Sequence, residues 1–447
     1  MTQRNPIRVL IAGGGFAGLY AALEFERALA RGAEIEVTLI NSDNFFLFTP
    51  MLHEVAASDL DLTHIVNPIR KLLRRVRFFH GTVEAIDLAA RHVVVTHSED
   101  RHEHAIEYDH LILSLGSVTN FFGLPGLEQS ARTMKSLGDA IGVRNQLIDL
   151  LETADFECAL GERNQLLTVV VAGGGFAGVE TIAGINDFLR EALEFYPNLG
   201  EEQIRVVLVH PGQVILPELG EKLGRYAQEK LRARKVEILT GTRITGVSSE
   251  SVYLSDGATL KTRTLIWTAG TSPNPLVQEL PCKRERGRIC VNPFMEVPEW
   301  PGVWALGDCA VVPGPDGKPY PPTAQHAIRQ GRVVAQNVLA EIRGAKKKPF
   351  VFTTIGQLAA IGRRTGVANI LGFNFSGFFA WWLWRTIYLL KLPRLEKKMR
   401  VALDWTLDIL FSKDLVQFST ERTRVGKQRE TGEARVEPAL TPTAAAD

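Results

Sequence analysis

A glycine-rich hexapeptide that occurs twice carries the strongest chemical signal in the sequence. The letters Gly-Gly-Gly-Phe-Ala-Gly fill residues 13–18 and again residues 173–178. Glycines spaced G-x-G-x-x-G between a strand and a helix let the free N–H groups of the helix start bind a pyrophosphate. Two copies therefore predict two dinucleotide sites. Their expected contacts are the loop residues Gly13, Gly14, Gly15, Phe16, Ala17 and Gly18, and Gly173, Gly175, Phe176, Ala177 and Gly178.

The segments around both loops supply the strands and helices that this chemistry needs. Each loop follows a short apolar run, 8–12 or 168–172, and precedes a helix-forming stretch, 19–30 or 179–193. Each half also has a later strand that ends in small residues, which let a flat ring approach the backbone. These residues are Ser114 and Gly116 in the first half, and Ala269 and Gly270 in the second. The pattern predicts an α/β fold with two Rossmann-like dinucleotide-binding domains.

One residue in each half stands where a ribose contact is expected, at the end of the second strand. The first is Asn41, with Asp43 as a nearby alternative, and the second is His210. A carboxylate at the second position would bind the ribose 2′-hydroxyl of NADH and repel a 2′-phosphate, whereas histidine does neither strongly. We expect NADH at this site, with NADPH as the open alternative.

Composition excludes several other classes of protein. The net charge of +1 over 447 residues gives no argument for a nucleic-acid partner, and 45% hydrophobic residues support real cores. The four cysteines are scattered, so neither a metal site nor a redox dithiol is indicated. Histidines are dense between residues 92 and 104, where we expect a solvated hairpin loop rather than a metal site. The sequence has no run of eighteen uncharged apolar residues, so we expect no membrane-spanning helix.

The segment 302–310 reads as a buried strand that ends in Gly-Asp. It resembles the second FAD motif, whose aspartate contacts the ribityl and pyrophosphate region, and this resemblance implies that Asp308 lies beside the first site. The chain is then expected to return to its first domain after completing the second. We predict an FAD-binding domain in two parts, 1–120 and 290–345, around an NAD(P)H-binding domain, 121–289. A C-terminal membrane-docking region, 346–420, and a disordered tail, 421–447, follow.

The C-terminal region combines aromatic and basic residues in a way that suits a membrane surface. Three tryptophans fall between residues 381 and 384, and the segment 395–410 is amphipathic. Such helices with a basic cluster are typical of docking to anionic lipids; the alternative is a helical hairpin packed on the body or in a dimer interface. The expected apolar face is Leu395, Met399, Ala402, Leu403, Thr406, Ile409 and Leu410, and the basic cluster is Lys391, Arg394, Lys397, Lys398 and Arg400.

Taken together, these motifs resemble the type II NADH:quinone oxidoreductases (alternative NADH dehydrogenases), a family of two-dinucleotide flavoproteins. The resemblance is carried by the paired loops and by the segments 178–180, 267–270 and 305–308. Residues 324–330, Ala-Gln-His-Ala-Ile-Arg-Gln, match the family motif A-Q-x-A-x-x-Q. The resemblance implies that Gln325 and Gln330 line a quinone site beside the flavin, with Glu180 nearby. Glu180 is expected in the first turn of the helix that follows the second loop. A carboxylate there either only interacts favourably with the helix dipole, or it orients substrate or relays protons.

The implied activity is that of a peripheral membrane flavoenzyme. NADH would reduce FAD in the first half, and a membrane quinone would accept two electrons, without proton pumping. We expect a homodimer on the cytoplasmic side of the cell membrane. The alternatives are an NADPH-preferring quinone reductase, a sulfide:quinone oxidoreductase, which needs a cysteine pair at the flavin, a soluble ferredoxin-type reductase, and a non-enzymatic redox sensor.

Overall fold

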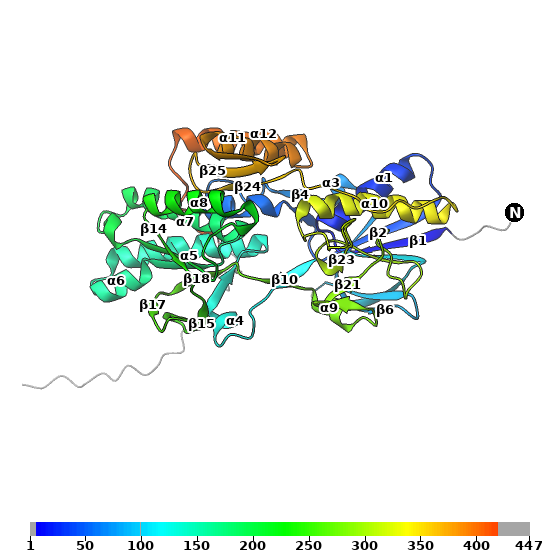
Figure 1. Ribbon diagram of the computed structural model, residues 1–447, viewed down its shortest axis with the longest axis horizontal. Helices are drawn as coiled ribbons and strands as arrows, with labels where there is room; N and C mark the ends of the chain where they lie inside the picture. The colour runs from blue at the N-terminus through cyan, green and yellow to red at the C-terminus, as the bar shows by residue number, and fades with distance from the viewer. Residues whose placement is uncertain (1–5, 99, 419–447) are drawn as a thin grey trace, which may run out of the picture.

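The computed structural model describes residues 6–98 and 100–418, and its first half is built on a five-stranded parallel sheet. The strand order is β22-β9-β1-β2-β5, which places a late strand at the edge of the N-terminal sheet. The strands are β1 (Ile7–Ala12), β2 (Ile35–Asn41), β5 (Arg77–His80), β9 (His110–Leu113) and β22 (Val303–Ala305). Helices α1 (Phe16–Ala30) and α10 (Ala324–Ile342) pack closely against each other beside this sheet (Figure 1).

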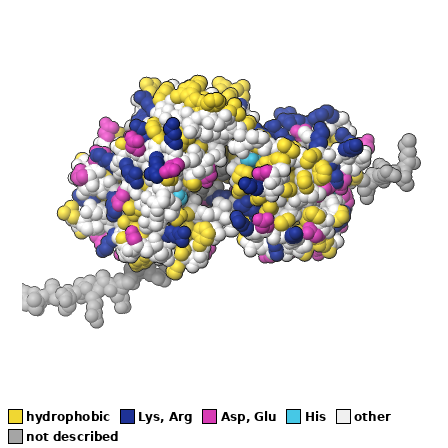
Figure 2. All heavy atoms as spheres, viewed as in Figure 1, with side chains coloured by type: hydrophobic (Ala, Val, Ile, Leu, Met, Phe, Trp, Pro, Cys, Tyr) yellow, Lys and Arg dark blue, Asp and Glu magenta, His cyan; other side chains and the backbone are white. Residues whose placement is uncertain are grey.

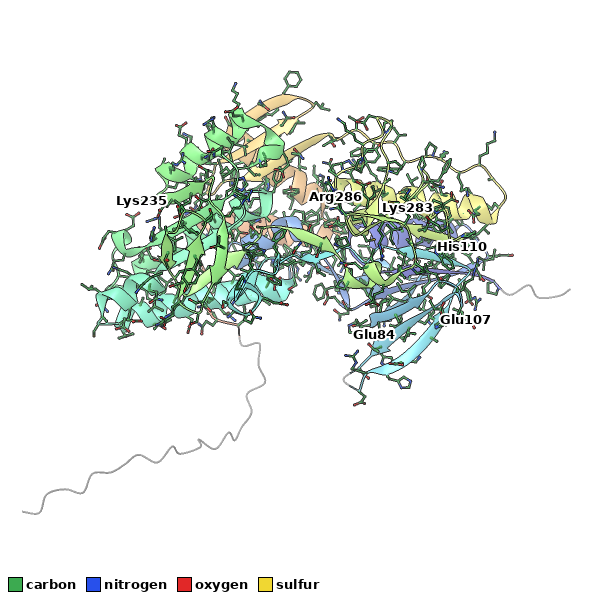
Figure 3. The ribbon with its side chains drawn as sticks, turned by 60° about the horizontal axis from the view of Figure 1, so that its bottom comes forward. Glu84, Glu107, His110, Lys235, Lys283 and Arg286 are labelled. Carbon is green, nitrogen blue, oxygen red and sulfur yellow. The ribbon has the colours of Figure 1, made fainter. Side chains whose placement is uncertain are left out.

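An antiparallel meander projects from the first half, and Figure 3 labels Glu84 and Glu107 on its strands. Its strands are β6 (Thr82–Asp87), β7 (His92–His97) and β8 (His102–Glu107). The predicted histidine loop is therefore wrong, because all four histidines between residues 92 and 104 lie on the paired strands β7 and β8. The rings of His97, His102 and His104 gather on one side of the hairpin. Within the described residues, no group of three His, Cys, Asp or Glu side chains is arranged to hold a metal.

The second half repeats the architecture of the first. Its parallel sheet has the order β11-β18-β12-β13-β14, and the central strand β12 is buried on both faces, as expected for a parallel sheet. The strands are β11 (Ala131–Thr133), β12 (Thr168–Ala172), β13 (Arg205–His210), β14 (Val236–Thr240) and β18 (Thr264–Trp267). The surrounding elements are α5 (Leu137–Phe156), α6 (Leu160–Leu166), α7 (Phe176–Ala192), α8 (Glu221–Ala233), and the small sheet β15 (Ile244–Val247), β16 (Ser251–Leu254) and β17 (Thr259–Lys261).

The two halves are joined by a pair of antiparallel strands, β10 (Ser117–Thr119) and β19 (Thr271–Pro273). Directly after β19, the short helix α9 (Pro275–Glu279) and the strand β21 (Arg288–Cys290) bury Val277 and Ile289 in the core of the first half. The return to the first domain therefore falls near residue 274 and not at the predicted residue 290. These elements are too short to show a periodic hydrophobic pattern from which the earlier return could have been predicted.

The C-terminal region is a three-stranded antiparallel sheet followed by two helices, which lie along the top of the molecule in Figure 1. The elements are β24 (Gly356–Ala360), β25 (Gly366–Ile370), β26 (Phe373–Gly377), α11 (Phe378–Lys391) and α12 (Leu395–Leu410). Among the described residues, no helix is long and apolar enough to cross a membrane. The predicted tail, 421–447, lies outside the described residues.

Candidate functional site

The two hexapeptides have the same backbone geometry. In each, a Cβ atom on the last glycine would meet a backbone oxygen: Gly18 would place it 1.8 Å from the oxygen of Gly13, and Gly178 1.8 Å from that of Gly173. No side chain fits there, because the helix start packs directly on the end of its strand. The sequence prediction of a tight strand–loop–helix turn is correct in both halves.

An added Cβ atom would find open space only at the third glycine of each loop, the one directly before the helix. A Cβ on Gly15 or Gly175 would meet nothing within 4 Å. These residues are the N-caps of α1 and α7, and neither helix start is capped by a side chain. The free N–H groups at a helix start attract anions. Both loops therefore fit the pyrophosphate of a dinucleotide.

Asn41 and His210 occupy equivalent positions and contact the loops directly. The N–H of Gly14 donates to Oδ1 of Asn41 at 2.8 Å, and the N–H of Gly174 donates to Nδ1 of His210 at 3.1 Å. Burial lowers the pKa of His210, so the ring is neutral and carries its proton on Nε2. That Nε2 is buried without a hydrogen-bond partner in the described residues, and it lies against the turn at Gly212.

The later strand of each half ties its loop in place. The hydroxyl of Ser114 donates to the backbone oxygens of Ala12 and Gly13, each at 2.9 Å. In the second half the hydroxyl of Thr268 donates to the oxygen of Ala172 at 2.7 Å. Ser114, predicted as a cofactor contact, therefore positions the first loop. The backbone then turns at Gly116 and Gly270, which have φ of 70° and 80°.

Asp308 lies beside the first loop, as the sequence predicts. Its Oδ2 accepts from the hydroxyl of Ser117 at 2.7 Å, and the preceding Gly307 has φ of 72°. The side chain of Gln330 holds this turn, because its Oε1 accepts from the N–H of Gly307 at 2.9 Å. Gln330 is buried there and does not line the neighbouring cavity. Its place in the wall of a quinone site stays a prediction, and in the structure its side chain holds the turn before Asp308.

The surroundings of the two identical loops differ. Helix α10 covers the first loop so closely that a Cβ on Gly331 would lie 2.2 Å from the oxygen of Ala17. As a result Ala17 is only 6% exposed, whereas its counterpart Ala177 is exposed. The end of the first loop at Ala17 is thus covered by α10, while Gly15 at its middle stays exposed, and the second loop is exposed at Ala177.

Two cavities meet at the junction of the two halves and the C-terminal helices. The larger, which we call the α10–α11 cavity, has a volume of about 520 Å³ and includes Gln325 in its wall. The other, the β18 cavity, has a volume of about 330 Å³ and lies against Ala177 and Gly270. Both are lined by Pro50, Phe176 and Tyr388. Groups bound in the two cavities would therefore lie close to each other, on either side of these three side chains.

Glu180 lies behind these cavities and lines neither of them. Helix α7 begins at Phe176, so Glu180 is the fifth helical residue, and its predicted place in the first turn is wrong. Its Oε1 accepts from Nε1 of Trp384 at 2.9 Å and from the N–H of Ala360 at 3.1 Å. Burial raises the pKa of Glu180 to about 8, although these two hydrogen bonds oppose the shift. The carboxyl group therefore holds a proton at neutral pH.

The raised pKa of Glu180 predicts a pH-dependent stability. The folded protein binds this proton more tightly than the unfolded chain between pH 4.5 and about 8. The contribution is therefore complete below pH 4.5 and lost as the pH rises towards 8, at about 1.4 kcal/mol per pH unit. Glu180→Gln keeps the acceptor oxygen and should reduce the slope of stability against pH in urea unfolding measured from pH 5 to pH 8; the raised pKa of Glu54, also about 8, accounts for a remaining slope. An unchanged slope would mean that Glu180 is ionised in the folded protein.

Comparisons with known proteins agree with this architecture. Residues 7–331 match the pyridine nucleotide-disulphide oxidoreductase family, and residues 355–414 match the NDH2 C-terminal domain. A type II NADH:quinone oxidoreductase of Mycobacterium tuberculosis is 32% identical over 421 residues, which are 90% of this chain and 88% of the relative. A probable NADH dehydrogenase of Dictyostelium discoideum is 30% identical, over 92% of this chain and 91% of the relative.

The solved structures show the same fold. The structure of NDH2 from Plasmodium falciparum in complex with NADH aligns with a TM-score of 0.86 at 20% identity, covering 92% of this chain and all of the other. A sulfide:quinone oxidoreductase of Aquifex aeolicus aligns less well, with a TM-score of 0.68 at 16% identity, over 90% of this chain and 94% of the other.

The paired Rossmann sheets and their two glycine loops define a two-dinucleotide flavoprotein of the pyridine nucleotide-disulphide oxidoreductase class. The C-terminal sheet and helices match the NDH2 C-terminal domain, and this match selects one family within that class. The chain belongs to the type II NADH:quinone oxidoreductase family.

Proposed function

We propose that the protein oxidises NADH and reduces a quinone, with the nicotinamide in the β18 cavity and the quinone in the α10–α11 cavity. The observation that carries this arrangement is the shared wall of Pro50, Phe176 and Tyr388 between the two cavities. FAD bound along the first loop supplies the electron transfer between nicotinamide and quinone. The protein positions both substrates and supplies protons.

Gln325 is our candidate for the residue that orients the quinone. It lies in the wall of the α10–α11 cavity, and its Nε2 donates to the oxygen of Gly356 at a long 3.3 Å. A long bond of this kind is weak, so the amide can turn towards a quinone carbonyl. Glu180 is our candidate for the group that supplies a proton, since it is protonated at neutral pH.

The environment of His210 favours NADH over NADPH. The neutral imidazole of His210 offers no positive charge to a 2′-phosphate, because burial lowers its pKa. Asn41 is the equivalent contact for the FAD ribose in the first half. Asp308, Gly116, Ala269 and Gly270 stay predictions as cofactor contacts.

The apolar face of α12 supports docking to a membrane. Leu395, Met399 and Leu403 point outwards and are 72%, 66% and 57% exposed, whereas Val401 and Trp405 are buried. Figure 2 shows hydrophobic side chains gathered over α11 and α12. Such a face is expected to enter the lipid interface, which would bring the adjoining α10–α11 cavity to a lipid-soluble quinone.

The basic cluster is smaller than the sequence predicts. Lys397 is buried, and its Nζ donates to the oxygen of Thr63 at 2.5 Å. Arg394 and Arg400 are both paired with Glu396. Lys391 and Lys398 line the α10–α11 cavity, and Nζ of Lys398 donates to the oxygen of Leu390 at 2.7 Å. These two lysines are the members of the cluster that can meet anionic lipid headgroups. The homodimer and the cytoplasmic side of the membrane stay predictions from the family resemblance.

A sulfide:quinone oxidoreductase is disfavoured by the cysteines. Cys158 is exposed on the surface, and Cys282 and Cys309 are buried. None of the cysteines lines the α10–α11 or the β18 cavity, whereas that chemistry needs a cysteine pair at the flavin.

An anaerobic mixing experiment tests the proposal. NADH or NADPH is added to the purified protein, bleaching of the flavin absorbance is followed, and a water-soluble quinone is then added. We expect rapid bleaching by NADH, slower bleaching by NADPH, and rapid recovery with quinone. Bleaching without recovery would refute quinone as the acceptor, and faster bleaching by NADPH would refute the assignment of His210.

Gln325→Ala should separate the two half-reactions. We expect flavin reduction by NADH to keep its rate, and recovery by quinone to slow by about tenfold to a hundredfold, as for loss of one orienting hydrogen bond to a reacting carbonyl. Gln336→Ala on the same helix, whose Nε2 bonds to Glu24, is the matched control. Equal slowing of both half-reactions would contradict the role of Gln325.

A further inference from the structure

A third, small cavity lies behind Glu180 and is lined mainly by charged side chains. Its volume is about 40 Å³, enough for roughly two or three water molecules. We call it the acidic cavity. Its carboxyl groups are Glu54, Asp59, Glu180, Asp187, Glu191 and Asp408, and its other polar groups are His53, Arg363, Arg385 and Lys413.

The inner end of the acidic cavity holds two buried glutamates with matching partners. Nε1 of Trp384, from α11, donates to Glu180, and Nε1 of Trp405, from α12, donates to both oxygens of Glu54 at 3.2 Å. The two indole rings are 6.4 Å apart. His53 also lines this end, with its Nδ1 3.9 Å from Oε2 of Glu180.

This inner end lies one layer of side chains behind the proposed quinone cavity. The ring of Trp384 packs edge-on against Tyr388, with centroids 4.8 Å apart. Tyr388 lines the α10–α11 cavity. Glu180 therefore stands between the acidic cavity and the place where a quinone would be reduced.

The outer end of the acidic cavity reaches solvent. The side chains of Arg363 and Glu191 are paired at 2.8 Å and are 39% and 30% exposed. Lys413 pairs with Asp59 at 2.7 Å beneath them. Ionisable groups thus run from the surface, through space for water, to the buried acids.

Burial keeps the proton on Glu54. It raises the pKa of Glu54 to about 8, and Asp59 and Asp408 reinforce the shift. Arg385 and the Trp405 hydrogen bond oppose it. Burial and the charge of Lys413 lower the pKa of His53 to about 3, so His53 stays neutral. A neutral imidazole can accept a proton on one nitrogen and release one from the other.

The proposed reaction needs one proton from water in each cycle. NADH brings two electrons and one hydrogen, whereas a quinol gains two hydrogens, so NADH, one proton and quinone give NAD⁺ and quinol. Resting on that function, we propose that the acidic cavity is the inlet for this proton, and that Glu54 passes it to Glu180. Glu54 touches no substrate and acts through Glu180, which is then reprotonated from solvent through Glu54.

Glu54→Gln tests the inlet. We expect flavin reduction by NADH to be unchanged, and flavin recovery by quinone to slow by about tenfold or more and to change its pH profile, with the remaining dependence near pH 8 due to Glu180. Glu54→Asp should restore part of the rate. In the resting protein, the infrared absorption of protonated carboxyl groups should lose one component in Glu54→Gln. The matched control is Glu107→Gln, on the exposed meander strand labelled in Figure 3.

A second variant keeps the carboxyl group. Trp405→Phe removes a hydrogen bond that lowers the pKa of Glu54, so the pH profile of flavin recovery should move to higher pH. Recovery by Glu54→Gln at the wild-type rate and with the wild-type pH profile would overturn the inlet. Failure of the wild-type protein to recover with quinone would instead overturn the proposed function.

Discussion

A triple variant is expected to release the protein from lipid vesicles: Leu395→Ser combined with Met399→Ser and Leu403→Ser. These side chains face outwards from α12, and the polar side of the helix faces the body: Asp404 pairs with His64, and Trp405 bonds to Glu54. Burying a large apolar side chain in lipid contributes about 1.5–3 kcal/mol. Three such losses should lower the vesicle partition coefficient by about a thousandfold or more.

Co-sedimentation with vesicles of anionic lipid measures this loss. Phe156→Ser with Leu160→Ser is the matched control, because these side chains are as exposed but lie at the α5–α6 turn. The triple variant should keep its thermal unfolding midpoint, since the replaced atoms are largely exposed. Vesicle binding at the wild-type level would show that α12 is not the docking surface.

Gly175→Ala is expected to weaken NADH binding without disturbing the fold. A Cβ at this position meets no protein atom within 4 Å, and it would occupy the space next to the free N–H groups of α7. Losing one or two hydrogen bonds to a charged pyrophosphate costs about 1.5–3 kcal/mol, or about tenfold to a hundredfold in dissociation constant.

Two further glycine variants give this prediction its contrast. Gly178→Ala should lower the unfolding midpoint, because its Cβ would lie 1.8 Å from the oxygen of Gly173. Gly161→Ala, in α6 with no neighbour near its Cβ, should change neither property. Fluorescence titration with NADH and thermal unfolding measure both. If Gly175→Ala leaves the NADH affinity unchanged, the pyrophosphate of NADH does not bind at the second loop.

Local patterns were enough to predict the two glycine loops, the strands around them, and the ends at Asn41 and His210. In each case the sequence signal and the structure involve residues close along the chain or repeated in it. The outward apolar face of α12 was also legible, because helical periodicity places Leu395, Met399 and Leu403 together.

The partners of Glu180 could not be predicted in this way. Its indole donor is 204 residues further along the chain, and that of Glu54 is 351 residues away. Such pairs depend on how the C-terminal helices pack on the body, which no local pattern encodes. The same holds for Gln330, which belongs to a recognisable motif and yet turns towards Gly307 rather than into the cavity.

The covered first loop and the open second loop have a consequence for residence time. The two loops have the same six-residue sequence, so the loop itself gives no reason for one dinucleotide to stay longer than the other. Helix α10 packs over Ala17 of the first loop, whereas Ala177 of the second loop is exposed. We therefore expect a dinucleotide at the first loop to dissociate more slowly than one at the second, and dissociation rates measured for the two nucleotides would check this.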